Sequence, residues 1–150
     1  MTDFQIDGYT PADPHMATEV GVELNYSTEV GPNVIDFNFR ARSTGNENKA
    51  FQKAAEKLSN IRDVRQKTGF KQPVIDALKE TLEIWYDHVI ISWNTTATQG
   101  GKPIESTREN FISLFSHPDQ IFIGVFNMLS SDCADVSNFT KEVEAEAVKN

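Results

Sequence analysis

The sequence predicts an α+β, mainly α-helical fold, in which an N-terminal two-stranded antiparallel β-hairpin packs on a bundle of about four to five helices. Two observations predict this fold: apolar residues alternate with polar ones over residues 19–42, and they recur at helical spacing over most of the later chain. The 150 residues, 39% of them hydrophobic, suffice for one core. We therefore expect a single globular domain over residues 19–138.

The first 42 residues contain an irregular segment and then the hairpin. Gly8, Pro11 and Pro14 interrupt residues 1–18, which we expect to form a flexible arm. Residues 20–26 and 35–42 each alternate apolar with polar side chains, on either side of a turn at Gly31 and Pro32. This period of two predicts antiparallel strands with one wet face, in a hairpin at 19–42. Such a ribbon is only marginally stable alone, so its apolar face must lie against helices.

Helical spacing predicts helices at about 47–67, 72–92, 106–116 and 118–131. Pro73 suits the opening turn of the second helix, because proline lacks the donor that would be unpaired there. The end of that helix, Val89–Trp93, fits an extended strand as well, and both interpretations stay open. Ser106 and Glu109 form a capping-box pattern at the start of the third helix. We expect residues 139–150, which are rich in Glu, to form an acidic C-terminal helix or tail.

Charge is divided into three blocks along the chain. Residues 1–39 carry a net charge of −7, residues 40–71 a net charge of +6, and residues 72–150 a net charge of −7. The acidic surroundings weaken long-range attraction to nucleic acid, and no recognition motif accompanies the bases. We therefore favour a solvated helix face, on which Lys49, Lys53 and Lys57 lie together, and which is able to dock an acidic protein partner.

No catalytic, cofactor-binding or metal-binding site is predicted. His15, His88 and His117 lie far apart in the sequence, and none has a ligand partner at metal-binding spacing. Cys133 follows Asp132, and an acidic setting raises the pKa of a thiol, so a buried thiol is favoured over a nucleophile. Gly100, followed by Gly and Lys, lacks the context of a phosphate loop and indicates a loop tip. We expect no enzyme activity.

The longest apolar stretch, residues 121–129, is shorter than the roughly 20 residues that a transmembrane helix needs. The amino terminus has no basic region followed by an apolar one, so no secretory signal is predicted. A single cysteine agrees with a reducing compartment. We therefore expect a cytoplasmic protein that contacts no membrane.

The predicted helix at 118–131 has scarcely any polar face, so it is either enclosed or covered by a partner. The candidate partner-binding residues are apolar residues of the last two predicted helices and the basic row of the first: Phe111, Phe115, Ile121, Phe122, Val125, Phe126, Leu129, Lys49, Lys53 and Lys57. For each apolar residue the alternative is ordinary core, which is favoured residue by residue. The aromatic residues are likewise expected to build core rather than a ligand pocket.

The order of these features resembles a known family. A strand ending in Phe37-Asn-Phe39-Arg-Ala-Arg42 leads through Asn46-Glu-Asn-Lys-Ala-Phe51 into a basic helix. A later segment ends in Val89-Ile-Ile-Ser-Trp93 and is followed by the Gly101–Ile104 turn and by residues 106–115. Over roughly residues 34–139 this arrangement is similar to the tail assembly chaperones of long-tailed bacteriophages.

That resemblance implies a non-enzymatic protein that keeps the tape measure protein soluble and helps tail tube subunits assemble around it. It places the protein in the cytoplasm of the infected bacterial host and outside the mature virion. A longer form made by ribosomal frameshifting near Lys149, and a second copy of the chain, are further candidate partners. The alternative is a structural virion protein, such as a head-tail connector or a subunit associated with the tail tube.

Overall fold

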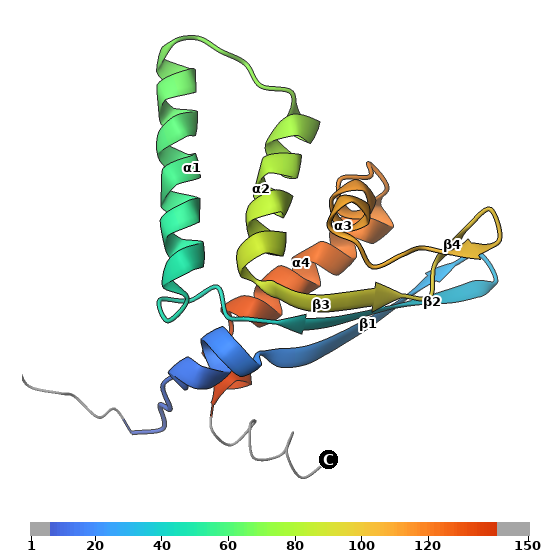
Figure 1. Ribbon diagram of the computed structural model, residues 1–150, viewed down its shortest axis with the longest axis horizontal. Helices are drawn as coiled ribbons and strands as arrows, with labels where there is room; N and C mark the ends of the chain where they lie inside the picture. The colour runs from blue at the N-terminus through green and yellow to red at the C-terminus, as the bar shows by residue number, and fades with distance from the viewer. Residues whose placement is uncertain (1–6, 141–150) are drawn as a thin grey trace, which may run out of the picture.

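The structure, a computed structural model, describes residues 7–140 and has an α+β fold (Figure 1). Its main sheet has three antiparallel strands in the order β1-β2-β3, and a two-stranded ribbon, β4-β5, lies apart from it. The strands are β1 (Val22–Val30), β2 (Asn33–Ala41), β3 (Ile90–Thr95), β4 (Thr98–Gln99) and β5 (Lys102–Pro103). The α-helices are α1 (Lys49–Lys67), α2 (Val74–His88), α3 (Arg108–Phe115) and α4 (Gln120–Ala134).

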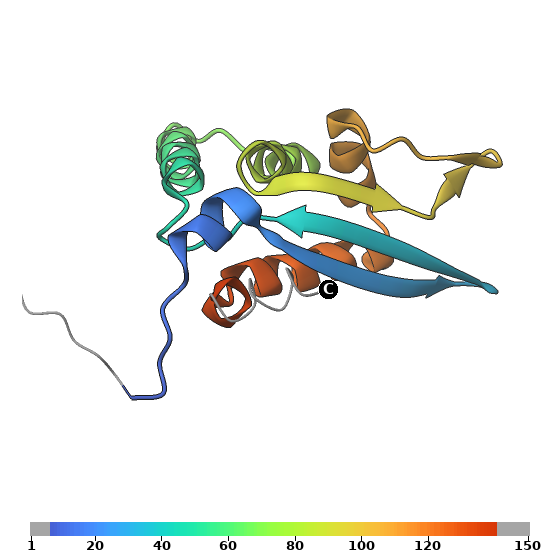
Figure 2. The ribbon, with the colours of Figure 1, turned by 60° about the horizontal axis from the view of Figure 1, so that its bottom comes forward.

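The two faces of the main sheet differ as the alternating sequence predicts. Leu24, Phe39 and Trp93 are partners across the three strands, and all three belong to the core that the helices cover. The opposite face carries polar side chains and is the one that comes forward in Figure 2. There the Asn38 Nδ2 donates to Asn94 Oδ1 at 2.7 Å. The predicted strands with one wet face are confirmed.

The sheet nevertheless contains more than the predicted hairpin. Residues 90–95, the first three of which were assigned to the end of a helix, form the third strand, and α2 ends at His88. The extended alternative for this segment is therefore correct. Pairing with β2 gives the two-stranded ribbon a third strand, and Ile90 and Trp93 gain a buried position on the helical side. A third strand is what makes such a sheet stable in water.

The expectation of a flexible arm through residue 18 is wrong for its last residues. Met16–Val20 forms a short helical turn, and Met16 and Ala17 are buried against Phe139. The backbone N–H of Asp13 donates to the Phe139 carbonyl at 2.7 Å. A second, smaller core thus joins the two ends of the described chain. Of the predicted C-terminal segment, residues 141–150 lie outside the described residues.

Aromatic side chains between the sheet and α3 form a large part of the main core, to which α2 and α4 also contribute. Phe37 and Phe39 of β2 contact the Phe115 ring, with centroids 5.8 and 5.9 Å apart. Trp93 of β3 contacts Phe111 with centroids 5.8 Å apart. Edge-on and tilted pairs of this kind are the arrangements that aromatic quadrupoles favour. The expectation that these residues build core is confirmed.

The helical hairpin α1–α2 projects away from the sheet (Figure 1). Its base is fixed by Asn48, whose Oδ1 accepts from the Phe51 N–H at 3.1 Å and so caps α1. The Asn48 Nδ2 also donates to the carbonyls of Ser43 and His88, both at 2.9 Å. This buried amide therefore joins the start of α1 to the end of α2 and to the segment that follows β2.

Replacing Asn48 tests how much this base contributes to stability. We expect Asn48→Ala to lower the free energy of unfolding by about 2 kcal/mol, because a cap is lost and the carbonyls of Ser43 and His88 lose their donor. Urea unfolding followed by circular dichroism measures the change. The matched control is Asn60→Ala on the exposed side of α1, which we expect to alter stability by less than about 0.5 kcal/mol. Equal effects of the two substitutions would contradict the role given to Asn48.

Candidate functional site

The apolar residues of α3 and α4 that the sequence offered as a binding surface are largely core. Phe111, Phe115, Val125 and Leu129 are all buried. They are packed in one cluster with β2 and β3. For these four residues the surface assignment is therefore wrong, because the sheet needs an apolar cover and α3 and α4 supply it.

The remaining candidates on α4 lie at the margin of the same core. Ile121, Phe122 and Phe126 are partly buried. The Phe122 ring lies 6.2 Å from that of Phe37, and the Phe126 ring lies 5.1 Å from that of Trp85. Contacts within the chain therefore account for the two aromatic residues. This leaves Ile123 and Met128 as the large apolar side chains that α4 exposes.

Among the α-helices of residues 7–140, α1 has the most open surface. None of its 19 residues is buried, although it packs along α2. Lys49, Lys53 and Lys57 are all exposed and stand four residues apart, so they lie in one row along the helix. The predicted basic face is thus present as a feature of the surface.

Polar bonds hold the far half of α1 against α2. Arg62 Nη2 donates to the Ala77 carbonyl at 2.7 Å and to Thr81 Oγ1 at 3.1 Å. Arg65 Nη1 lies 3.1 Å from Glu80 Oε1. A hydrogen bond from Gln72, together with Arg65, lowers the pKa of the Glu80 carboxyl. The far half of α1 therefore contacts α2 through arginine side chains. Nearer the base, the contact is apolar, because Phe51 packs against Trp85.

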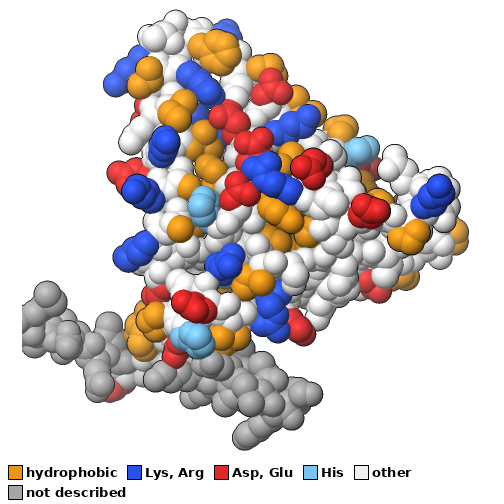
Figure 3. All heavy atoms as spheres, in the orientation of Figure 1, with side chains coloured by type: hydrophobic (Ala, Val, Ile, Leu, Met, Phe, Trp, Pro, Cys, Tyr) orange, Lys and Arg blue, Asp and Glu red, His pale blue; other side chains and the backbone are white. Residues whose placement is uncertain are grey.

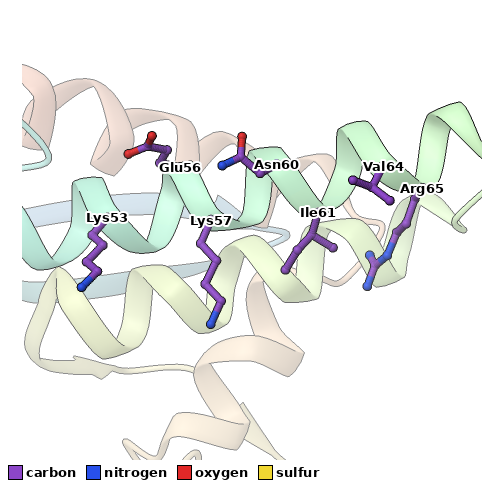
Figure 4. A pocket seen from close by; sticks show the side chains of 7 residues that line it. All are labelled: Lys53, Glu56, Lys57, Asn60, Ile61, Val64 and Arg65. Atoms are coloured by element: carbon purple, nitrogen blue, oxygen red, sulfur yellow. The ribbon is translucent and has the colours of Figure 1, made fainter.

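The open side of α1 forms a shallow groove of about 570 Å³ between two rows of side chains. Lys53, Lys57, Ile61 and Arg65 form one row, and Glu56, Asn60 and Val64 form the other. In Figure 4 the side chains of the first row point to the lower side of the helix, whereas Glu56 and Asn60 point to its upper side. We call this feature the α1 groove. All seven of its residues belong to a single helix, so no other element of the described chain covers it.

Large apolar side chains are exposed at the far end of the hairpin, next to this groove. Val64 is 62% exposed, Phe70 is 56% exposed and Val74 is 85% exposed. Ile61 and Ile75 are exposed as well. Figure 3 shows hydrophobic side chains gathered at this end of the molecule and Lys and Arg side chains along the outer edge of α1. We call these five residues the apolar tip.

Sequence reasoning missed Ile61 and Val64 as surface residues. Phe51, Leu58 and Ile61 recur at helical spacing in the sequence, a pattern typical of the buried side of a helix. The stripe that faces α2 continues instead through Arg62 and Arg65. The sequence does contain a signal for this exposure. Ile61 directly precedes Arg62 and Val64 directly precedes Arg65, and in both pairs the arginine is the residue that contacts α2. Apolar residues beside a polar interface stripe are expected to lie in the open.

The two lysines of the groove form no ion pair with the described part of the chain. Among residues 7–140, the ion pairs are Arg40–Glu23, Arg65–Glu80 and Arg108–Asp87. Neither Lys53 nor Lys57 pairs with a carboxylate of that part of the chain. The groove lining therefore has three cationic side chains against one carboxylate, Glu56.

Two further side chains with ionisable groups are Cys133, which is buried, and Tyr26, which is partly buried. Burial raises the pKa of the Cys133 thiol to about 12, with a further contribution from Asp132. Tyr26 Oη donates to Asp132 Oδ2 at 2.5 Å, and burial raises the pKa of that hydroxyl well above its usual range. Within residues 7–140 no three His, Cys, Asp or Glu side chains are placed to hold a metal ion. Gly100 and Gly101 form the predicted loop tip, between β4 and β5, where both have positive φ.

Truncation of adjacent α4 residues tests which of them are core. We expect Leu129→Ala to lower the free energy of unfolding by about 2–5 kcal/mol, because Leu129 is fully buried and its loss leaves a cavity. The neighbouring Met128 is 44% exposed, so Met128→Ala should cost less than about 1 kcal/mol. Chemical unfolding of the two variants gives both values. A Met128 variant as unstable as the Leu129 variant would show that α4 buries a different face.

The raised pKa of Cys133 predicts a pH dependence of stability. An unfolded thiol ionises near its ordinary pKa of 9.0, whereas the folded one keeps its proton up to about 12. Stability from this group is therefore complete below pH 9 and falls as the pH rises toward 12, by about 2 kcal/mol at about pH 10.5. We expect Cys133→Ala to remove this part of the loss, measured as unfolding free energies at about pH 8 and about pH 10.5. Identical pH slopes for the two proteins would refute the assignment.

Comparison with protein-family models, with characterised proteins and with solved structures gives no match to this chain. No helix in residues 7–140 has the length and apolar character that crossing a membrane requires. What the arrangement offers chemically is a surface: an uncovered helix face with two unpaired lysines, continued by exposed apolar side chains at the apolar tip.

Proposed function

We propose that this chain is a tail assembly chaperone of a long-tailed bacteriophage. It binds the tape measure protein, keeps it soluble and promotes assembly of the tail tube without catalysis. The resemblance over residues 34–139 supplies the identity of the client. The open face of α1 supplies the surface on which binding takes place.

The observation that carries the proposal is the exposure of α1. A helix of 19 residues with no buried side chain obtains little of its stability from the core, yet it displays Ile61 and Val64 to solvent. Exposed apolar side chains grouped on one surface mark sites of protein contact. Tape measure proteins are long helical chains whose apolar stripes need a cover before the tube encloses them, and a helix face provides such a cover.

The position of this surface suits a temporary cover. The hairpin projects from the sheet, so a bound segment lies along α1 without entering the aromatic core (Figure 1). The cores made by Phe37, Phe39 and Phe115 are complete within the chain. The protein is therefore able to bind and release a client without refolding, as an assembly factor must.

Co-expression with the tape measure protein tests the proposal. We expect this chain to keep the tape measure protein in the soluble fraction and to co-purify with it. We expect Val64→Asp to reduce the co-purified amount at least about tenfold, because a carboxylate then occupies the apolar part of the groove. Met128→Asp places the same group on the exposed part of α4 and serves as the control, with no loss expected. A tape measure protein that stays insoluble in the presence of this chain would contradict the proposal.

Mass spectrometry of purified particles separates the chaperone from a structural virion protein. A chaperone is absent from mature particles, whereas a connector or a tube-associated subunit is present in a fixed ratio to the other tail proteins. Stoichiometric amounts in every particle would favour the structural alternative.

A further inference from the structure

The α1 groove has the form that a second helix fits. Side chains four residues apart form ridges on a helix, and a ridge of one helix packs into the groove between two ridges of its partner. The row Lys53-Lys57-Ile61-Arg65 and the row Glu56-Asn60-Val64 are two such neighbouring ridges. On the side toward α2, residues of both helices, among them Leu58, Arg62 and Trp85, line a second groove of about 330 Å³. On the open side nothing in residues 7–140 fills the α1 groove.

The charges of the groove select the kind of helix. Lys53 and Lys57 stand together at the end nearer the base, without ion pairs to described residues. Ile61 and Val64, which belong to the apolar tip, line the other end of the groove. Arg65, in contrast, forms an ion pair with Glu80 of α2. A complementary helix therefore carries carboxylates at one end of its contact and aliphatic side chains at the other.

We propose that the α1 groove binds an amphipathic helix of a partner protein whose apolar stripe is flanked at one end by Asp or Glu side chains. The aliphatic residues of the partner lie over Ile61 and Val64. Its carboxylates lie between Lys53 and Lys57 and fix the direction in which the helix runs. Electrostatic complementarity of this kind acts mainly on specificity and on the rate of association.

This inference rests on the proposed function only for the protein that supplies the helix. The groove itself is tested with two designed peptides of about 20 residues, each an amphipathic helix with the same leucine stripe. One carries Glu at the flanking positions of one end and the other carries Lys there. Overlapping peptides that tile the tape measure protein are tested beside them, so that a failure of the client and a failure of the groove are distinguishable.

We expect the Glu-flanked peptide to bind at least about tenfold more tightly than the Lys-flanked one in calorimetric titrations at low salt. The paired substitution Lys53→Glu and Lys57→Glu should abolish this preference. Lys79→Glu with Lys102→Glu makes the same change in net charge at two exposed positions outside the groove and should leave binding within about twofold. Circular dichroism melts establish that both variants fold. Among the tape measure peptides, the acidic amphipathic ones should bind and should respond to the same substitutions.

Four outcomes would overturn the inference. The first is equal binding of the two designed peptides, and the second is binding that charge reversal in the groove leaves unchanged. The third is a dimer in sedimentation experiments that Val64→Asp dissociates, because the groove is then filled by a second copy. The fourth is a large gain in affinity on removal of residues 141–150, because the occupant is then a segment of this chain. Binding of the Glu-flanked peptide without any tape measure peptide would uphold the groove and refute the client.

Discussion

The contact of the β2 aromatic residues with α3 and α4 is the interaction on which the rest of the structure depends. Phe37 touches Phe115 of α3 and Phe122 of α4, so one side chain joins the sheet to both helices. Aromatic side chains bury about 150–250 Å² each, which makes them the largest single contributors to a core of this size. Residues of α3 and α4, together with Leu82 and Trp85 of α2, cover the apolar face of the sheet. Helix α1 therefore packs against α2 and not against the sheet.

The position of α1 follows from that division. Near its base, α1 has a capping amide and the Phe51–Trp85 contact, which tie it to the core. Farther from the base, the contacts between the two helices are polar. Arg62 of α1 donates to Thr81 and to the Ala77 carbonyl of α2, and Arg65 pairs with Glu80. Arginine forms several directed bonds from one planar group, so it holds the two helices together without requiring the apolar residues beside it. Ile61 and Val64 are therefore free to face solvent.

Much of the fold was predictable from the sequence, and the remainder depended on contacts between distant segments. The strands that include Leu24 and Phe39 were predicted because their two faces differ in polarity. Residues 90–95 were ambiguous, because an apolar run such as Val89–Trp93 fits both periods, and its partner strand lies some fifty residues away. The candidate site was predicted in its lysines, since Lys49, Lys53 and Lys57 share a row in any helix. The apolar candidates were placed on α3 and α4, where most of them are core, because composition alone does not distinguish a helix that covers a sheet from one that covers a partner.

A surface with lysines at one end and aliphatic residues at the other binds a partner with only moderate affinity. Burying Ile61 and Val64 contributes a few kcal/mol at most, far less than the area of an obligate interface provides. Opposite charges raise the rate of encounter but add little to affinity at the exposed positions of Lys53 and Lys57. The combination therefore gives fast association with moderate residence time. Under the proposed function, the client must later be enclosed by another protein and needs a cover that forms quickly and is displaced easily. A single uncovered helix face suits that requirement better than a deep pocket would.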